Sequence, residues 1–372
     1  MADPLVPRTA SPGPLQIGSV GLASPCAVAP MAGMTDSAFR RLVKRHGGCG
    51  LVVTEMVSSE GLVRGIDRTL EYAEYTEEER PISIQIFGGE PQRMAEAARI
   101  VQDLGADIVD VNMGCPVPKI AKHHAGCSLM REPEHAASVI EAMARAVTIP
   151  VTVKMRAGWN EHEINAPRLA KLVEAAGAAA VAVHGRTASQ SYSGVSDWDL
   201  IAHVADEVRI PVFGSGDCIE PEQIVERLRH SRIGGILVGR GVLRNPWILA
   251  QAAALANGRP VPSVTLAEKG RFLLDYIDLL LDEGMNEAEG FRHTAGTGGT
   301  RQAVSPARGR ERWVINKVRA LGGWYTKGIE NGSHLRTAVN QCNSIPALRE
   351  LVAAFFERPL SDGTPVEAVL IP

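Results

Sequence analysis

The chain has 372 residues, of which 45% are hydrophobic and 22% are charged, and its formal net charge at pH 7 is −3. These values are ordinary for a globular protein and argue against indiscriminate binding to nucleic acid, and no apolar run is long enough to span a bilayer. The six cysteines include no CxxC pair, so we expect reduced thiols in the cytoplasm rather than a disulfide framework.

Residues 1–16 are rich in proline and show no basic stretch followed by an apolar one, so we expect a disordered leader rather than a secretory signal. Eight short β-rich runs follow this leader, and most are separated by an amphipathic helical segment. The runs are residues 26–30, 51–56, 81–88, 107–116, 151–155, 179–184, 211–215 and 234–239.

Several of the helical segments between these runs open with proline or an N-capping residue, as helix starts do. Examples are residues 91–104, 133–146, 165–176 and 221–229. Strands that are apolar on both faces and are each followed by a helix form a parallel sheet, and eight such units close into a barrel. We therefore predict a (β/α)8 TIM barrel over residues 17–258. A doubly wound sheet is the alternative, but no GxGxxG follows the first run.

The strand pattern stops after residue 258, and apolar residues then recur at helical spacing. This change predicts a smaller all-helical C-terminal domain over 262–358, followed by a tail, 359–372. A Gly-rich, basic segment without periodicity, 295–309, predicts a loop within it. The helical stretches are residues 266–281, 312–321, 335–339 and 346–356.

Positive charge is concentrated in this helical domain, where nine basic residues and two acidic ones lie between Arg292 and Arg336. A local basic face can bind phosphates whatever the charge of the whole chain, although a solvated helix surface would have the same composition. The basic residues are Arg292, Arg301, Arg308, Arg310, Arg312, Lys317, Arg319, Lys327 and Arg336.

A barrel of this type places its chemistry at the carboxyl ends of its strands. Lys154 lies near the end of run 151–155, where an ammonium is costly to bury unless it meets an anion. Ser215-Gly216 and Gly239-Arg240 form glycine turns after the last two runs, where barrels hold phosphate on backbone N–H groups. With His184 on a neighbouring run, these residues predict a pocket for a phosphate-bearing cofactor. No spacing of histidines and carboxylates predicts a metal site.

Cys115 lies in the turn Asn112-Met-Gly-Cys-Pro116, which follows the fourth run. A thiol on the loop beyond a buried strand can hand a proton to a bound substrate, whereas a core cysteine cannot. The other five cysteines are most simply small core or loop residues. From the turn alone, a proton donor and a structural cysteine are comparable interpretations.

Several stretches occur together and in a fixed order between about residues 17 and 343: Ala29-Pro-Met-Ala-Gly-Met-Thr-Asp36, Gln85-Ile-Phe-Gly88, Asp110-Val-Asn-Met-Gly-Cys-Pro116, Val153-Lys-Met-Arg-Ala-Gly158, His184-Gly-Arg-Thr187, Gly239-Arg-Gly241 and Trp324-Tyr-Thr-Lys-Gly328. This set resembles the tRNA-dihydrouridine synthase family. The N-terminal segment and the stretch 192–198 are most similar to its bacterial B-type members.

The resemblance implies an FMN enzyme that reduces the C5–C6 double bond of a uridine in tRNA, with NADPH or NADH as the electron donor. Cys115 would be the general acid that protonates C5, a role that suits a thiol because its unperturbed pKa is about 8.5. The positions that would bind the flavin and its phosphate are Pro30, Met31, Gln85, Lys154, His184, Ser215, Gly216, Asp217, Gly239 and Arg240.

A uridine within folded tRNA must be turned out of its stack to reach a barrel mouth. The resemblance therefore implies tRNA as the partner, with no role for DNA or a membrane, and nothing in the sequence demands more than a monomer. Asn112 would pair with the base edge or steady the flavin. The implied contacts with the tRNA backbone are Lys119, Lys122, Arg156, Arg319 and Lys327.

The sequence departs from the family pattern at Ser215, Ala320 and Leu321, where Asn, Lys and His are usual. Two alternatives therefore stay open: an RNA-binding or regulatory barrel with little catalysis, and an FMN barrel reductase of a small unsaturated substrate such as a dihydropyrimidine. The intact Cys115 and Lys154 favour an enzyme. The basic helical domain favours tRNA, because a small-molecule reductase has no use for it.

Overall fold

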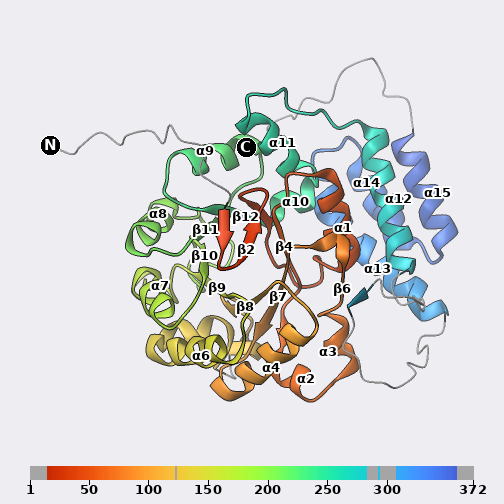
Figure 1. Cartoon of the computed structure of the whole chain (residues 1–372). Helices are drawn as coiled ribbons and strands as arrows, with labels where there is room; N and C mark the ends of the chain where they lie inside the picture. Colours follow the sequence, from red (N-terminus) through yellow and green to blue (C-terminus); the bar gives the residue numbers. More distant parts are fainter. Residues whose placement is uncertain (1–14, 122–123, 283–291, 294–306, 358–372) are drawn as a thin grey trace.

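Figure 1 shows a computed structural model of the chain, which describes residues 15–121, 124–282, 292–293 and 307–357. Most of the predicted leader, the predicted tail and nearly all of the Gly-rich segment 295–309 lie outside the described residues. The remainder forms a barrel of strands surrounded by helices, with a group of further helices packed against one side (Figure 1).

Eight parallel strands close into a ring, and each coincides with one predicted run, although β9 extends one residue beyond its run (Figure 1). The ring closes because β4 (Leu51–Val53) pairs with both β3 (Cys26–Val28) and β7 (Ile82–Phe87). The predicted (β/α)8 barrel is confirmed, and the doubly wound sheet is wrong. The other strands of the ring are β8 (Ile108–Met113), β9 (Val151–Arg156), β10 (Ala180–His184), β11 (Val212–Ser215) and β12 (Gly235–Val238). The short β5 (Val57–Ser58) also pairs with β7, next to the place where β4 does.

Helices cover the outside of this ring, and local sequence signals explain where they begin. Proline occupies the first turn of α4, and the Glu90 carboxylate before it accepts hydrogen bonds from two backbone N–H groups. The long outer helices are α1 (Ser37–His46), α4 (Pro91–Asp103), α6 (Pro133–Ala146), α7 (Ala166–Ala175), α8 (Trp198–Glu207), α9 (Pro221–Arg229) and α11 (Ile248–Ala256). Shorter elements are α2 (Ser59–Val63), α3 (Asp67–Glu71), β6 (Tyr75–Thr76), η1 (Glu77–Glu79), α5 (Pro118–Ala121), η2 (Gly126–Arg131) and α10 (Arg240–Arg244).

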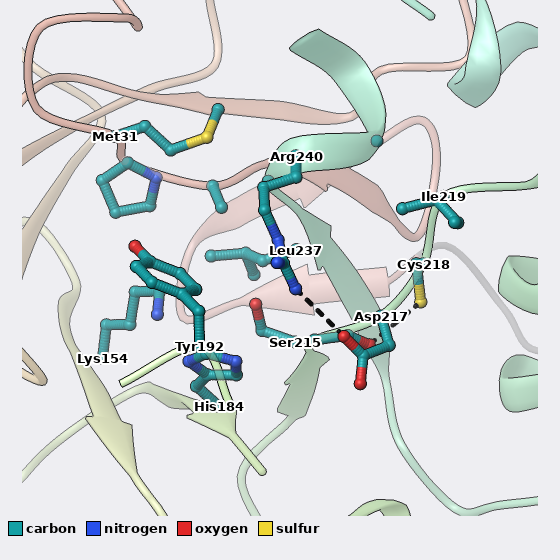
Figure 2. Close-up of a pocket in the computed structure, with 15 residues that line it drawn as sticks. Met31, Lys154, His184, Tyr192, Ser215, Asp217, Cys218, Ile219, Leu237 and Arg240 are labelled. Atoms are coloured by element: carbon teal, nitrogen blue, oxygen red, sulfur yellow. Dashed lines mark hydrogen bonds and ion pairs between the residues drawn. The ribbon is translucent and has the colours of Figure 1, made fainter. Parts of the chain in front are cut away.

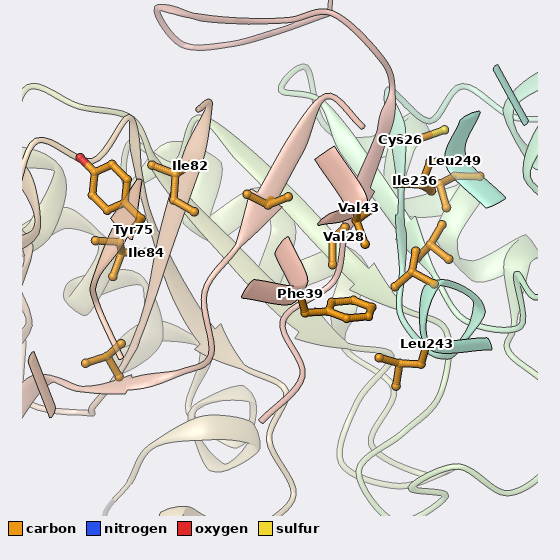
Figure 3. Close-up of a cluster of buried hydrophobic side chains, with 14 of the residues drawn as sticks. Cys26, Val28, Phe39, Val43, Tyr75, Ile82, Ile84, Ile236, Leu243 and Leu249 are labelled. Carbon is orange, nitrogen blue, oxygen red and sulfur yellow. The ribbon is translucent and has the colours of Figure 1, made fainter. Parts of the chain in front are cut away.

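Successive residues of a strand alternate between two apolar cores. Cys26 and Val28 face the helices outside the ring (Figure 3), whereas Ala27 belongs to the cluster inside it. The inner cluster also contains Ala180 and Ala182, and such small side chains leave room inside the barrel for larger polar ones. Removal of this apolar surface from water stabilises both layers.

A hairpin that the sequence analysis did not predict adds to the inner core. It consists of β1 (Leu15–Ile17) and β2 (Val20–Leu22), and its buried side chains Ile17 and Leu22 join the interior cluster. β1 begins at Leu15, so the predicted end of the leader at residue 16 falls inside a strand. Strands of three residues are too short for a periodic pattern to reveal.

The helical C-terminal region packs on the barrel through α12, which contacts α1 (Figure 1). The Phe272 ring on α12 lies edge-on to Phe39 of α1, with ring centroids 6.1 Å apart, and stacks on Tyr325 at 5.3 Å. A single apolar core therefore runs from the barrel into these helices. The elements here are α12 (Leu266–Asp282), β13 (Arg292–His293), α13 (Ala307–Tyr325), α14 (Gly332–Gln341) and α15 (Ile345–Phe356).

A buried ion pair fixes the loop between β3 and α1, which borders the carboxyl end of the barrel. Arg40 Nε lies 2.6 Å from Glu79 Oε1, and the two side chains are 2% and 0% exposed. Arg40 also donates to the backbone oxygen of Thr35 at 2.7 Å. Glu79 in turn accepts a hydrogen bond from the Ser37 hydroxyl at 2.9 Å. The conformation of the loop thus depends on a fully satisfied buried pair.

We expect Arg40→Met to lower the free energy of unfolding by about 3–5 kcal/mol, because it leaves the Glu79 carboxylate buried without its partner. The matched control is Arg45→Ala, since Arg45 pairs with Glu78 but is 45% exposed. This change should cost no more than about 1 kcal/mol. Urea denaturation of both variants measures the difference, and equal losses would contradict a special role for the buried pair.

Candidate active site

A cavity opens at the carboxyl ends of the strands, between β9 to β12 and the loops that follow β3 and β10 (Figure 2). All but one of the predicted cofactor-binding residues line it. The exception, Gln85, is buried in the barrel interior beside Asp110 and Asn112. The structure thus brings together Pro30, Met31, Lys154, His184, Ser215, Gly216, Asp217, Gly239 and Arg240.

Lys154 projects from β9 into this cavity, beside the small Ala182 of β10 (Figure 2). Its ammonium has no hydrogen bond or ion pair within the part of the chain that the structure describes. Burial and the nearby Arg156 lower the pKa of Lys154 to about 8, although Asp110 opposes the shift. A buried ammonium without a counter-charge favours the binding of an anionic group.

His184 ends β10 and is 8% exposed. Burial, followed by the positive charges of Lys154, Arg156, Arg186 and Arg240, lowers its pKa to about 2. The imidazole is therefore neutral at physiological pH. It can donate one hydrogen bond and accept another, but it adds no further charge to the cavity.

Asp217 lies in a sharp turn after β11, and its carboxylate pairs with two arginines. Its carboxylate lies 3.0 Å from Arg240 (Figure 2). It also lies 2.8 Å from Arg186 and accepts the backbone N–H of Ser196 at 2.8 Å. The turn needs positive φ angles, 122° at Gly216 and 53° at Asp217. Both carboxylate oxygens are engaged, so Asp217 orients Arg240 at the cavity wall and does not itself suit an anion.

Tyr192 covers the mouth of the cavity, a position that the sequence analysis did not assign (Figure 2). Tyr192 is 61% exposed, and its ring centroid lies 5.2 Å from the Arg240 guanidinium and 5.9 Å from that of Arg156. The ring centroid is 6.5 Å from that of His184. The sequence does show an aromatic residue on the loop that follows β10. This could have indicated a contact with a ligand, because loops at this end of a barrel carry functional residues.

The Cys115 turn is closed by the side chain of Asn112 near the end of β8. Asn112 Oδ1 accepts the backbone N–H groups of Gly114 at 3.1 Å and Cys115 at 2.9 Å. Burial raises the pKa of the Cys115 thiol above its usual value, whereas a backbone hydrogen bond at Val117 and the charge of Arg156 act in the opposite direction. The thiol is thus protonated at neutral pH, as a proton donor must be.

Two predicted substrate contacts are used inside the protein. Asn112 directs its amide to the Cys115 turn and to Gln85. Its contact with a base edge or with the flavin stays a prediction. Arg156 is 4% exposed and donates to the backbone oxygens of Gly114 at 2.8 Å and Thr187 at 2.9 Å. Its guanidinium thus bonds within the protein, and its contact with a tRNA backbone stays a prediction.

A cluster of buried charges joins α13 to the loop before α1. Lys317 Nζ lies 3.0 Å from Asp36 Oδ2 and 3.3 Å from Glu55 Oε1, and it donates to the backbone oxygen of Gly33 at 3.2 Å. The Tyr276 hydroxyl on α12 also donates to Asp36, at 2.8 Å. Lys317 belongs to the predicted basic face, but in the fold its ammonium holds the loop that carries Met31.

Other members of the predicted basic face are also used internally. Arg319 donates to the backbone oxygens of Asn340 and Cys342, at 2.9 and 2.8 Å, and thereby caps the end of α14. Lys327 is exposed and stacks on Trp324, with its ammonium 4.3 Å from the ring centroid, so it stays a candidate phosphate contact. Lys122 and the side chain of Lys119 lie outside the described residues.

Three further observations concern thiols, metals and membranes. All six cysteines are free. Among the residues that the structure describes, no three His, Cys, Asp or Glu side chains gather in a way that could bind a metal ion. Within the same residues, no helix combines the length and the apolar character that a membrane span requires.

The family model for dihydrouridine synthase (Dus) matches residues 27–357, which include the barrel and the helices beyond it. This chain belongs to the dihydrouridine synthase family. It is 36% identical over 344 residues to a "Probable tRNA-dihydrouridine synthase" of Rickettsia bellii, with 92% of this chain and 98% of that protein covered. It is also 36% identical over 352 residues to "tRNA-dihydrouridine synthase B" of Xanthomonas campestris, with 94% and 98% covered.

Similarity to solved structures shows the fold of this member of the dihydrouridine synthase family and nothing further. The crystal structure of TcOYE with pHBA has a TM-score of 0.50 at 12% identity, with 69% of this chain and 95% of that chain covered. Histamine dehydrogenase from Rhizobium sp. 4-9 has a TM-score of 0.52 at 13% identity, with 72% and 50% covered. Because one barrel fold serves many reactions, these two structures carry no argument about the reaction.

Lys154 gives the ligand-free protein a testable dependence of stability on pH. Its pKa is about 8 in the folded protein and about 10.4 in an unfolded chain. The unfolded state therefore binds more protons between these values, so the penalty that Lys154 imposes below pH 8 disappears as the pH rises through this window. We expect Lys154→Met to be more stable than the wild type at neutral pH, with the gap narrowing towards about pH 10.4.

Urea denaturation at several pH values measures this gap. The matched control is Lys171→Met, because Lys171 lies at the surface with 54% of its side chain exposed. The control should show no such narrowing. A gap between Lys154→Met and the wild type that is constant with pH would contradict the lowered pKa.

Proposed function

We propose that this chain reduces the C5–C6 double bond of specific uridines in tRNA to dihydrouridine, with FMN as cofactor and NADPH or NADH as electron donor. The relatives named above support this reaction. One observation carries the proposal within the family: a buried ammonium without a hydrogen-bond or ion-pair partner among the described residues, Lys154, lies on the strand next to the one that leads to the protonated Cys115 thiol. A regulatory barrel with little catalysis would have no use for this arrangement.

The residues that line the cavity fit FMN. Lys154 would hold the end of the flavin ring that carries negative charge on reduction, and Arg240, oriented by Asp217, would hold the phosphate. A Cβ added to Gly239 would meet only Met31 and Ala29, at 3.5 and 3.8 Å, and both of these line the cavity. The backbone at Gly239 is therefore open to a ligand. When bound, the flavin supplies the hydride that reaches C6 of the uracil ring.

Cys115 supplies the proton. Reduction of the double bond requires one hydride at C6 and one proton at C5, and the Cys115 Sγ–H bond breaks as the C5–H bond forms. The raised pKa of the thiol keeps it in the acid form, and the thiolate left behind regains its proton from water. Arg156 holds the backbone of this turn at Gly114 and so keeps the thiol in place.

The tRNA would lie across the barrel mouth and the helical region. We propose that Lys119, Lys122 and Lys327 contact its backbone first, because Arg156 and Arg319 already donate to backbone oxygens of the protein. Phosphate contacts of this kind release counter-ions, so binding should weaken as salt increases. We retain the expectation of a monomer that acts on tRNA and not on DNA.

Dihydrouridine mapped position by position in tRNA from cells that lack the gene is the test of this proposal. We expect dihydrouridine to disappear from one or a few positions and to return when the wild-type gene is restored. Unchanged dihydrouridine at every position would remove tRNA as the substrate. Purified protein without flavin absorbance, even after incubation with FMN, would contradict both the tRNA enzyme and a small-molecule reductase.

Cys115→Ala should keep the oxidation of NADPH by the bound flavin and reduce uridine reduction by roughly 100- to 10,000-fold, because only the proton donor is lost. The two half-reactions are measured separately, by flavin absorbance and by dihydrouridine content. The control is Cys127→Ala, which removes a buried thiol from the same loop. Equal loss of both half-reactions in Cys115→Ala would assign the thiol a structural role.

A further inference from the structure

A continuous series of side-chain hydrogen bonds runs from the barrel interior to the Cys115 turn. Gln85 Nε2 donates to Asp110 Oδ2 at 2.6 Å, and Asn112 Nδ2 donates to Gln85 Oε1 at 2.7 Å. Asn112 Oδ1 then accepts the backbone N–H of Cys115 at 2.9 Å. At the inner end, the Thr152 hydroxyl donates to Asp110 Oδ1 at 2.6 Å. We call Asp110, Gln85 and Asn112 the amide relay.

The amide relay has only one direction that satisfies all its members. The backbone N–H of Cys115 can only donate, so the carbonyl oxygen of Asn112 must face it and the amide nitrogen must face Gln85. Gln85 then has to present its oxygen to Asn112 and its nitrogen to the next residue inward. That residue must offer an acceptor, which is the role that Asp110 fills.

The backbone and the burial of these residues fix the relay in place. Gln85 and Asp110 are partners across β7 and β8, and Asp110 and Thr152 are partners across β8 and β9. Every member of the relay is buried. A buried network of this kind is rigid when complete, and it is costly when one donor lacks an acceptor.

Packing alone does not explain a carboxylate at this depth. Asp110 borders the same interior space as Leu51, Val53 and Phe213, which are apolar. Burial raises the pKa of Asp110, whereas the hydrogen bonds from Gln85 and Thr152 lower it. The carboxyl group is therefore retained in an unfavourable environment, where its acceptor oxygens serve the two donors.

We propose that Asp110 is a positioning residue for Cys115: by accepting the Gln85 amide, it sets the orientation of Gln85 and Asn112 that closes the Cys115 turn. The inference rests on the proposed role of Cys115 as proton donor. Asp110 acts through its acceptor oxygen, at the far end of the relay from the thiol. A turn that opens displaces the thiol, and a displacement of about 1 Å can cost roughly a hundredfold in rate.

A reversal of the relay tests this proposal. Asn112→Asp keeps an oxygen for the Cys115 N–H but sets a second oxygen against that of Gln85, so the relay is broken. Addition of Asp110→Asn supplies a donor at the inner end, and Gln85 can then turn around and satisfy both neighbours. Both proteins carry the new carboxylate at position 112, and the double variant reverses the relay while it returns the number of carboxylates in this layer to one, as in the wild type. The control is Ser83→Ala, because Ser83 is a buried neighbour on β7 whose hydroxyl has no partner among the described residues.

We expect Asn112→Asp to lower kcat for uridine reduction by roughly tenfold to a hundredfold with little change in the KM for tRNA. The double variant Asn112→Asp with Asp110→Asn should recover most of this loss, and Ser83→Ala should keep the wild-type value. A merely structural defect would not be repaired by a second substitution in the same buried layer. If Asn112→Asp alone does not fold, recovery of folded protein in the double variant is the expected result.

A second measurement does not depend on the proposed function. Iodoacetamide alkylation of Cys115, followed by mass spectrometry of its peptide, should be several-fold faster in Asn112→Asp than in the double variant. If wild-type protein forms no dihydrouridine, the proposed function fails while this measurement still decides the relay. A double variant that is no better than Asn112→Asp in kcat, in folding and in alkylation would overturn the proposal.

Discussion

The cost of holding the Lys154 ammonium inside the barrel, without a counter-charge, is the constraint on which the site depends. Most cations around it have partners: Asp217 engages Arg186 and Arg240, and backbone oxygens engage Arg156. Asp110, whose negative charge favours the protonated ammonium, is itself buried and occupied by two donors. The cavity is therefore electropositive, and an anionic ligand would relieve a cost that is already built into the folded chain.

The positive charge of the cavity, together with burial, explains why neighbouring groups keep the protonation states that the chemistry needs. His184 lies among four cations and is neutral, so it can share hydrogen bonds with a ligand without repelling Lys154 further. Burial keeps Cys115 protonated even though Arg156 is nearby. An electropositive cavity thus contains an acid rather than a thiolate, because burial outweighs the attraction of the thiolate to the guanidinium.

The fold could be predicted from the sequence because eight apolar runs alternate with helices, and that pattern follows from backbone geometry alone. Lys154, His184 and the glycine turns could be placed on one rim for the same reason. The partners of individual charges could not be predicted. Lys317 and Arg319 appear in the sequence as members of one basic stretch. In the fold, Lys317 binds carboxylates far away along the chain, and Arg319 binds backbone oxygens that stay without a helical partner at the end of α14. Likewise, the sequence shows that Asn112 has an amide, but not that this amide bonds to Gln85 and to the backbone N–H groups of Gly114 and Cys115.

The contact of Lys317 with Asp36 and Glu55 has a consequence for how such proteins can diverge. A residue of α13 completes the loop that carries Met31, so the helical region is a part of the cavity's support as well as a surface beside it. Exchange of this region between relatives, whether by recombination or in a designed chimera, would replace Lys317 and leave its partners Asp36 and Glu55 in place. Such an exchange would preserve the cavity only where the incoming helix brings a cation to the same place. The two halves of the chain are therefore expected to evolve as a matched pair and not as interchangeable modules.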